Sequence, residues 1–216
     1  MKKIILTILI LALPALVWAG EYILYPDSVG TYQNWSTGGS GSYHWDRVDD
    51  PWGYHDSDTS YLSAAYDLWT YETEKLQNPT AIPDGDIIDS VDAILKARCT
   101  VCTGELQSGA FYIVWWNGTT LIESVVKNPF SGYPAQTTTT FHDKRTTALD
   151  DLAWTKAKLN NLQVGLFLDE GNLYPIRVTA INVHVYTTTP STAIKSHTIT
   201  KDIEDAQGIL EGGVVR

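Results

Sequence analysis

The chain has 216 residues, a formal net charge of −10 at pH 7 and a mean hydropathy of −0.13. So acidic a chain gains no counterion-release free energy on nucleic acid or anionic lipid, which excludes both as expected partners. The length suits one large β domain followed by a tail.

The N-terminus has the pattern of a secretory signal peptide. Met1-Lys2-Lys3 is cationic, Ile4–Val17 is apolar, and Ala19 is a small residue suited to a cleavage site. We therefore expect residues 1–19 to be a signal peptide cleaved near Ala19, and the mature protein to be secreted or held at the cell surface. No later apolar stretch approaches the roughly 20 residues of a membrane span, so no span is expected.

The first apolar segment of the mature chain is Glu21, Tyr22, Ile23, Leu24 and Tyr25. A short apolar segment at the end of a chain can add to the sheet edge of a neighbouring molecule, which makes it a candidate assembly strand. The alternative is that it forms the first strand of its own domain.

Aromatic residues are concentrated between Tyr32 and Tyr71. Four of them lie among Gly, Ser and Asp residues, which indicates loops: Trp35, Trp45, Trp52 and Tyr54. Exposed rings can stack on the C–H faces of sugars, so these four are candidate glycan-binding residues. The alternative is that they cover the ends of the fold or form an assembly interface.

Asp56 and Asp58 close an aspartate-rich segment and are candidate calcium ligands, because calcium prefers hard oxygen donors. Their spacing lacks the glycine and terminal glutamate of an EF-hand loop. The alternative is that they are turn residues bonding their own backbone. Apart from this candidate calcium ion, no cofactor is expected.

Residues 87–101 alternate between apolar and polar side chains, which predicts a half-buried strand. Cys99 and Cys102 lie at its end and are the only cysteines. In an exported protein they favour a disulfide, and the chain must then bend at Thr100-Val101, because residues three apart in a strand are too distant to bond. Zinc ligation and free thiols are the alternatives.

Two β-rich runs, Phe111–Trp116 and Leu121–Val126, flank Asn117-Gly118, which predicts a hairpin with a type I′ turn. Thr155 predicts the N-cap of a short helix.

Further strands are predicted at residues 163–168 and 176–186. Together these patterns predict an all-β, antiparallel β-sandwich with one short helix, spanning residues 20–189. Residues 190–216 read as a tail or linker.

Several segments together resemble a jelly-roll-like β-sandwich module found in phage structural proteins and exported microbial surface proteins. They are Asp56–Leu62, Ile82–Gly85, Trp154-Thr155, Leu159–Leu166 and Arg177–Tyr186. The resemblance spans roughly residues 25–187. It implies a non-catalytic role in structure, attachment or adhesion, and it implies no active-site residues.

The main hypothesis is a secreted, non-enzymatic structural or adhesive protein that associates with itself or with other surface proteins. The alternative is a carbohydrate-binding module that uses loop aromatics, assisted by calcium. A glycoside hydrolase with an unrecognised carboxylate pair is a third hypothesis, and no hydrolase motif supports it.

Overall fold

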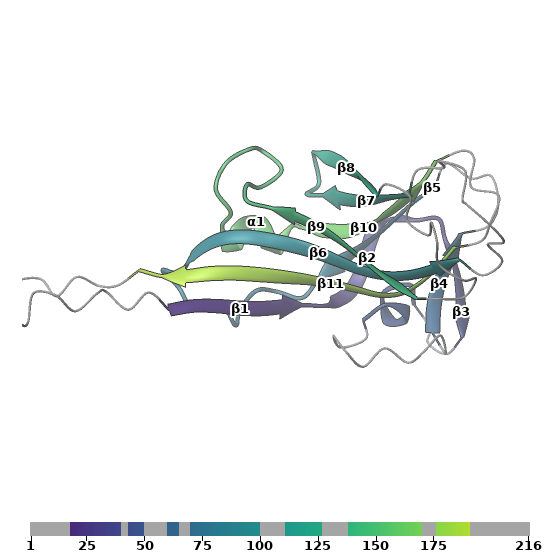
Figure 1. Cartoon of the computed structure of the whole chain (residues 1–216), viewed down its shortest axis with the longest axis horizontal. Helices are drawn as coiled ribbons and strands as arrows, with labels where there is room; N and C mark the ends of the chain where they lie inside the picture. Colours follow the sequence, from purple (N-terminus) through teal and green to yellow (C-terminus); the bar gives the residue numbers. More distant parts are fainter. Residues whose placement is uncertain are drawn as a thin grey trace, which may run out of the picture. The chain divides into compact units, whose positions relative to one another are not determined.

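The computed structural model describes residues 18–39, 43–49, 60–64, 70–99, 111–126, 138–169 and 176–190. Within these ranges Trp18–Thr189 forms one compact unit of two antiparallel sheets that face each other (Figure 1). The antiparallel β-sandwich predicted from the sequence is confirmed. None of the helices in these ranges is long and apolar enough to cross a bilayer.

The first sheet has six strands in the described residues. They are β1 (Trp18–Leu24), β3 (Ser36–Gly39), β4 (Ser60–Ala64), β6 (Ile87–Cys99), β9 (Thr139–Arg145) and β11 (Ile176–Thr189). Their order is β3-β4-β11-β6-β9, and β1 also pairs with β11. The long β6 and β11 therefore form the centre of this layer (Figure 1).

The second sheet has five strands in the same ranges, in the order β2-β5-β10-β7-β8. They are β2 (Pro26–Gln33), β5 (Thr70–Leu76), β7 (Phe111–Trp116), β8 (Leu121–Val126) and β10 (Gln163–Leu168). Two short helices complete the described elements, the 3-10 helix η1 (Trp45–Arg47) and α1 (Lys156–Asn160). Thr155 caps α1 as predicted, because its Oγ1 accepts a hydrogen bond from Lys158 N–H at 3.3 Å.

Side chains at alternate positions of the strands point between the two sheets and form the core. Leu95 and Val183 from the first sheet, and Trp115 and Leu166 from the second, are fully buried members of one cluster. In β6 the apolar face that includes Leu95 and Cys99 lies in this core, but the strand is not half-buried as predicted, because Asp92 and Lys96 on its other face are also buried. In β11 a bulge between Val178 and Ala180 shifts the alternation.

The hairpin of β7 and β8 is confirmed, but its turn is not type I′. Trp116 pairs with Leu121, so the loop holds the four residues between them. Only Gly118 has a positive φ there (94°), whereas a type I′ turn needs two such residues. The Asn117 side chain instead accepts hydrogen bonds from the backbone N–H groups of Thr119 and Thr120.

The segment proposed as an assembly strand is engaged within its own domain. Glu21, Tyr22, Ile23 and Leu24 pair in register with β11, and Leu24 is buried in the core. The hypothesis that Glu21–Tyr25 is free to join a neighbour is therefore corrected, because Glu21–Leu24 already pair with β11 of the same chain.

Within the described residues β6 extends to Cys99, which is buried. Cys102 lies outside the described residues, so the disulfide stays a prediction. The predicted signal peptide (residues 1–17 of it) and tail (from residue 191) also lie outside them.

Candidate functional site

The outer surface of the five-stranded sheet carries a group of aromatic side chains. In β5, β7 and β10 the side chains alternate, so those that point away from the core include Tyr71, Tyr112, Trp116 and Phe167. Phe167 pairs with Tyr71 on one side and with Tyr112 on the other, which brings rings from three strands together. Tyr32 of β2 joins them. We call these five residues the aromatic face: Tyr32, Tyr71, Tyr112, Trp116 and Phe167.

The rings of the aromatic face touch one another. Phe167 stacks on Tyr71 with centroids 4.3 Å apart and an interplanar angle of 16°, and it lies 5.4 Å from Tyr112. Tyr32 lies 5.3 Å from Tyr71 and meets Trp116 edge to face at 5.9 Å. Phe167 is 4% exposed, whereas the other four are partly exposed. Phe167 therefore supports rings that reach solvent.

Polar contacts fix the orientation of these rings. The Trp116 indole N–H donates to Thr31 Oγ1 at 3.0 Å, and Gln163 Nε2 donates to the same oxygen at 3.0 Å. The backbone N–H of Thr31 donates to Gln163 Oε1 at 2.6 Å. The Trp116 ring is thus held by a small network between β2, β7 and β10 before any ligand arrives.

Tyr71 donates a hydrogen bond to the carboxylate of Glu123, an exposed residue on β8. Burial, followed by the hydrogen bond and negative charge of Glu123, raises the pKa of Tyr71 to about 12. The tyrosine hydroxyl stays protonated at physiological pH. The aromatic face thus combines apolar ring surface with hydroxyl, amide and carboxylate groups at its margins.

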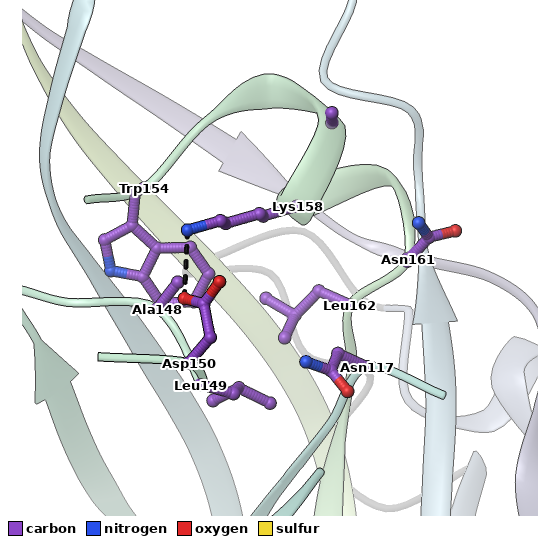
Figure 2. A pocket seen from close by; sticks show the side chains of 9 residues that line it. Asn117, Ala148, Leu149, Asp150, Trp154, Lys158, Asn161 and Leu162 are labelled. Atoms are coloured by element: carbon purple, nitrogen blue, oxygen red, sulfur yellow. Dashed lines mark hydrogen bonds and ion pairs between the residues drawn. The ribbon is translucent and has the colours of Figure 1, made fainter. Parts of the chain in front are cut away.

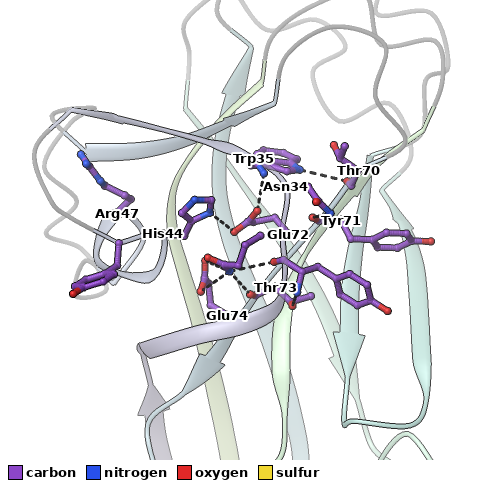
Figure 3. Close-up of polar contacts among 12 residues, drawn as sticks. Asn34, Trp35, His44, Arg47, Thr70, Tyr71, Glu72, Thr73 and Glu74 are labelled. Carbon is purple, nitrogen blue, oxygen red and sulfur yellow. Dashed lines mark hydrogen bonds and ion pairs between the residues drawn. The ribbon is translucent and has the colours of Figure 1, made fainter.

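A second arrangement lies on the opposite, inward side of β5. Glu72 and Glu74 are both 0% exposed, and His44, next to η1, contacts Glu72 with its Nδ1 2.6 Å from Oε1 (Figure 3). The backbone N–H of Trp35 donates to Glu72 Oε2 at 2.8 Å. We call His44, Glu72 and Glu74 the buried carboxylate cluster.

Ionisation of Glu74 is strongly disfavoured in this cluster. Burial, and then the charge of Glu72, raises the pKa of Glu74 to about 9. Burial also raises the pKa of Glu72, and the Trp35 N–H and His44 oppose that rise. In the absence of a cation the pair therefore holds a proton at neutral pH.

A cavity of about 260 Å³ lies between the β7–β8 turn and α1 (Figure 2). Its lining includes Asn117, Trp154 and Lys158. Lys158 Nζ lies 2.9 Å from Asp150 Oδ1, so the two charged groups of the lining compensate each other. This cavity offers no uncompensated charge to a ligand.

The structure separates the four loop aromatics proposed from the sequence. Trp35 is 3% exposed and belongs to the core, so its ring is not available to stack on a sugar, which corrects that candidate. Trp45 lies in η1, is partly exposed, and stacks with Tyr43 at 6.2 Å and 9°. Trp52 and Tyr54 lie outside the described residues, as do the calcium candidates Asp56 and Asp58.

Sequence reasoning missed the aromatic face. In the run Phe111–Trp116, Tyr112 and Trp116 share a parity opposite to that of the core residues Ile113 and Trp115. Two aromatic residues on the side of one strand that faces away from the core were a signal that could have predicted this surface. Bringing them beside Tyr71 required knowledge of the strand order, which the sequence does not state.

No protein-family model matches the chain, and no curated protein matches it. Among solved structures, the chain is similar to the "xylan-binding module CBM15" at 14% identity and a TM-score of 0.40, covering 77% of this chain and 97% of that one. It is similar to the "Family 16 Carbohydrate Binding Module-2" at 10% identity and a TM-score of 0.35, covering 58% and 76%.

A third similar structure is "CBM29_1, A Family 29 Carbohydrate Binding Module from Piromyces equi", at 12% identity and a TM-score of 0.31, covering 81% of this chain and 93% of that one. At these values the likeness carries no residue roles or ligands to this chain.

Proposed function

We propose that this chain is a non-catalytic glycan-binding β-sandwich and that its aromatic face is the binding surface. The observation that carries the proposal is the aromatic face itself: partly exposed rings from β2, β5 and β7 over one buried phenylalanine. This replaces the loop aromatics of the sequence-based hypothesis as the site.

The chemistry of the surface suits a sugar. Pyranose rings present C–H faces that pack on aromatic rings, while their hydroxyl groups need polar partners. Trp116 and Tyr112 supply ring surface, and Thr31 and Glu123 supply a hydroxyl and a carboxylate beside it. Because the network around Thr31 already holds the Trp116 ring, little side-chain entropy is lost on binding.

The charge of the chain narrows the glycan class. Glu123 lies beside the aromatic face, and the whole chain carries a net charge of −10. An anionic polysaccharide would meet like charge at this surface. A neutral polysaccharide is therefore the proposed ligand.

The proposal is compatible with an adhesive role and with export, which remain proposals. From the sequence alone we also propose secretion after cleavage near Ala19, a disulfide between Cys99 and Cys102, and calcium binding at Asp56 and Asp58. We do not propose self-assembly through Glu21–Tyr25, because β1 pairs with β11.

Affinity electrophoresis tests the proposal. The wild-type chain is run in gels containing cellulose derivatives, xylan, mannan or β-glucan, beside Trp116→Ala and the matched control Trp45→Ala. We expect at least one neutral polysaccharide to retard the wild type and Trp45→Ala, and Trp116→Ala to migrate as in an empty gel.

Retardation of Trp116→Ala equal to that of the wild type would overturn the assignment of the aromatic face. If only Trp45→Ala lost its retardation, the binding site would lie at the loop aromatics predicted from the sequence. The melting temperature of each variant is measured in parallel, so that loss of binding is separated from loss of folding.

A further inference from the structure

The buried carboxylate cluster brings three groups with metal-ligand chemistry to one point. A nitrogen of His44 and one oxygen each from Glu72 and Glu74 all lie within 4.8 Å of one another. Glu72 and Glu74 are two apart on β5 and so project from the same face of the strand, while His44 arrives from the segment beside η1. Figure 3 shows His44 and both glutamates turned toward one another.

In the described ranges this cluster holds two carboxyl groups, and His44 is the one basic side chain that contacts them. Glu72 bonds to His44, to the Trp35 N–H and to Glu74. Glu74 bonds to Gln33 and to the backbone N–H of Gly30. Within the described ranges neither carboxylate contacts a lysine or arginine, although both are 0% exposed. Buried carboxylates are stable when paired with a cation or metal and unfavourable otherwise.

The surroundings orient the carboxylates as the outer partners of a metal site do. The Trp35 N–H holds Glu72 Oε2, which leaves Oε1 facing His44. Gln33 Nε2 reaches both oxygens of Glu74 at 3.3 Å, long contacts that position the group weakly. Such outer hydrogen bonds fix ligand direction and are a regular part of metal sites.

The donor set selects among cations. Zinc accepts imidazole nitrogen and carboxylate oxygen as ligands and is usually four-coordinate, so this cluster would supply three ligands and a water the fourth. Calcium needs six to eight oxygen donors, more than this cluster provides. The His44 side chain is 22% exposed, so the cluster borders solvent on that side.

We propose that His44, Glu72 and Glu74 bind one zinc ion. The ion would tie the η1 segment to β5 and neutralise the two buried carboxylates. Because Glu72 and Glu74 point to the opposite side of β5 from Tyr71, this site is separate from the aromatic face and does not depend on the proposed glycan function.

The test uses the full-length chain without a histidine tag, treated with EDTA and then dialysed free of it. Zinc chloride is titrated by isothermal calorimetry at neutral pH, and thermal melts are recorded with and without zinc. The variants are Glu74→Gln and His44→Gln, and the controls are Glu123→Gln and His142→Gln, an exposed glutamate and an exposed histidine away from the cluster.

We expect one zinc equivalent in the wild type with a raised melting temperature, and at least a tenfold loss of affinity in Glu74→Gln and His44→Gln. The controls should bind as the wild type does. No binding by the wild type, binding unchanged in both cluster variants, or equal losses in the controls would each overturn the proposal. His44→Gln replaces a partly exposed side chain, so it keeps the test valid if Glu74→Gln does not fold.

Discussion

The clearest consequence of the buried carboxylate cluster is a pH-dependent loss of stability in metal-free protein. Glu74 has a pKa of about 9 in the folded chain, against 4.5 for the free side chain. Above pH 4.5 the unfolded chain releases this proton while the folded chain keeps it. The folded state then binds more protons than the unfolded state, so stability falls as pH rises and the fall ends near pH 9.

The size of this effect follows from the interval in pH. One pKa unit corresponds to about 1.36 kcal/mol, so between pH 4.5 and 7.5 the contribution of Glu74 to the free energy of unfolding falls by about 4 kcal/mol. Glu74→Gln keeps the shape of the side chain and cannot ionise. The variant should therefore be more stable than the wild type at pH 7.5, and its advantage should shrink by about 4 kcal/mol at pH 4.5.

Urea unfolding followed by tryptophan fluorescence measures this difference at both pH values, with EDTA present throughout. Glu123→Gln is the control, because it removes an exposed carboxylate that lies outside the buried carboxylate cluster. If Glu74→Gln and the wild type lose stability in parallel between pH 4.5 and 7.5, Glu74 does not hold a proton in the folded chain and the reasoning fails.

Three further variants test the fold itself. Gly165→Ala should destabilise the chain by about 3 kcal/mol, because a Cβ at this position would lie 1.8 Å from the backbone oxygen of Glu72; Gly118→Ala, which meets no atom within 4 Å but has a φ of 94°, should lose only about 1 kcal/mol. Equal losses of unfolding free energy in the two variants would contradict this packing. Deletion of Glu21–Tyr25 should leave a chain without a cooperative thermal transition, because it removes β1 from β11 and the core residue Leu24. A stable monomer would show instead that β1 is dispensable and free to join a neighbour.

The strands that sequence alone predicted are those with a clear apolar pattern, either alternating or continuous. Apolar residues bounded by turn residues mark β6, β10, β11 and the β7–β8 hairpin. The helix α1 is marked by its N-cap residue Thr155. The predicted type I′ turn of this hairpin was wrong. The Asn117 side chain accepts hydrogen bonds from the backbone N–H groups of the next residues, and the Asn-Gly pair alone does not reveal this.

The site was harder to predict because its residues come from strands distant in sequence. Tyr32, Tyr71 and Trp116 become neighbours only through the order β2-β5-β10-β7. In β5 the sequence Tyr-Glu-Thr-Glu-Lys has no apolar parity, so nothing marks Glu72 and Glu74 as inward-facing. Trp35 has the composition of a loop around it and yet packs into the core.

The aromatic face is tested most directly by the indole N–H resonances of the tryptophans in a nitrogen-15 NMR titration. The ligand is an oligosaccharide of whichever neutral polysaccharide retards the chain. The Trp116 resonance, whose N–H donates to Thr31, should move and saturate as ligand is added, while the Trp45 resonance stays in place. A shift confined to Trp45, or no shift of Trp116 at saturating ligand, would contradict the claim that the aromatic face binds glycans.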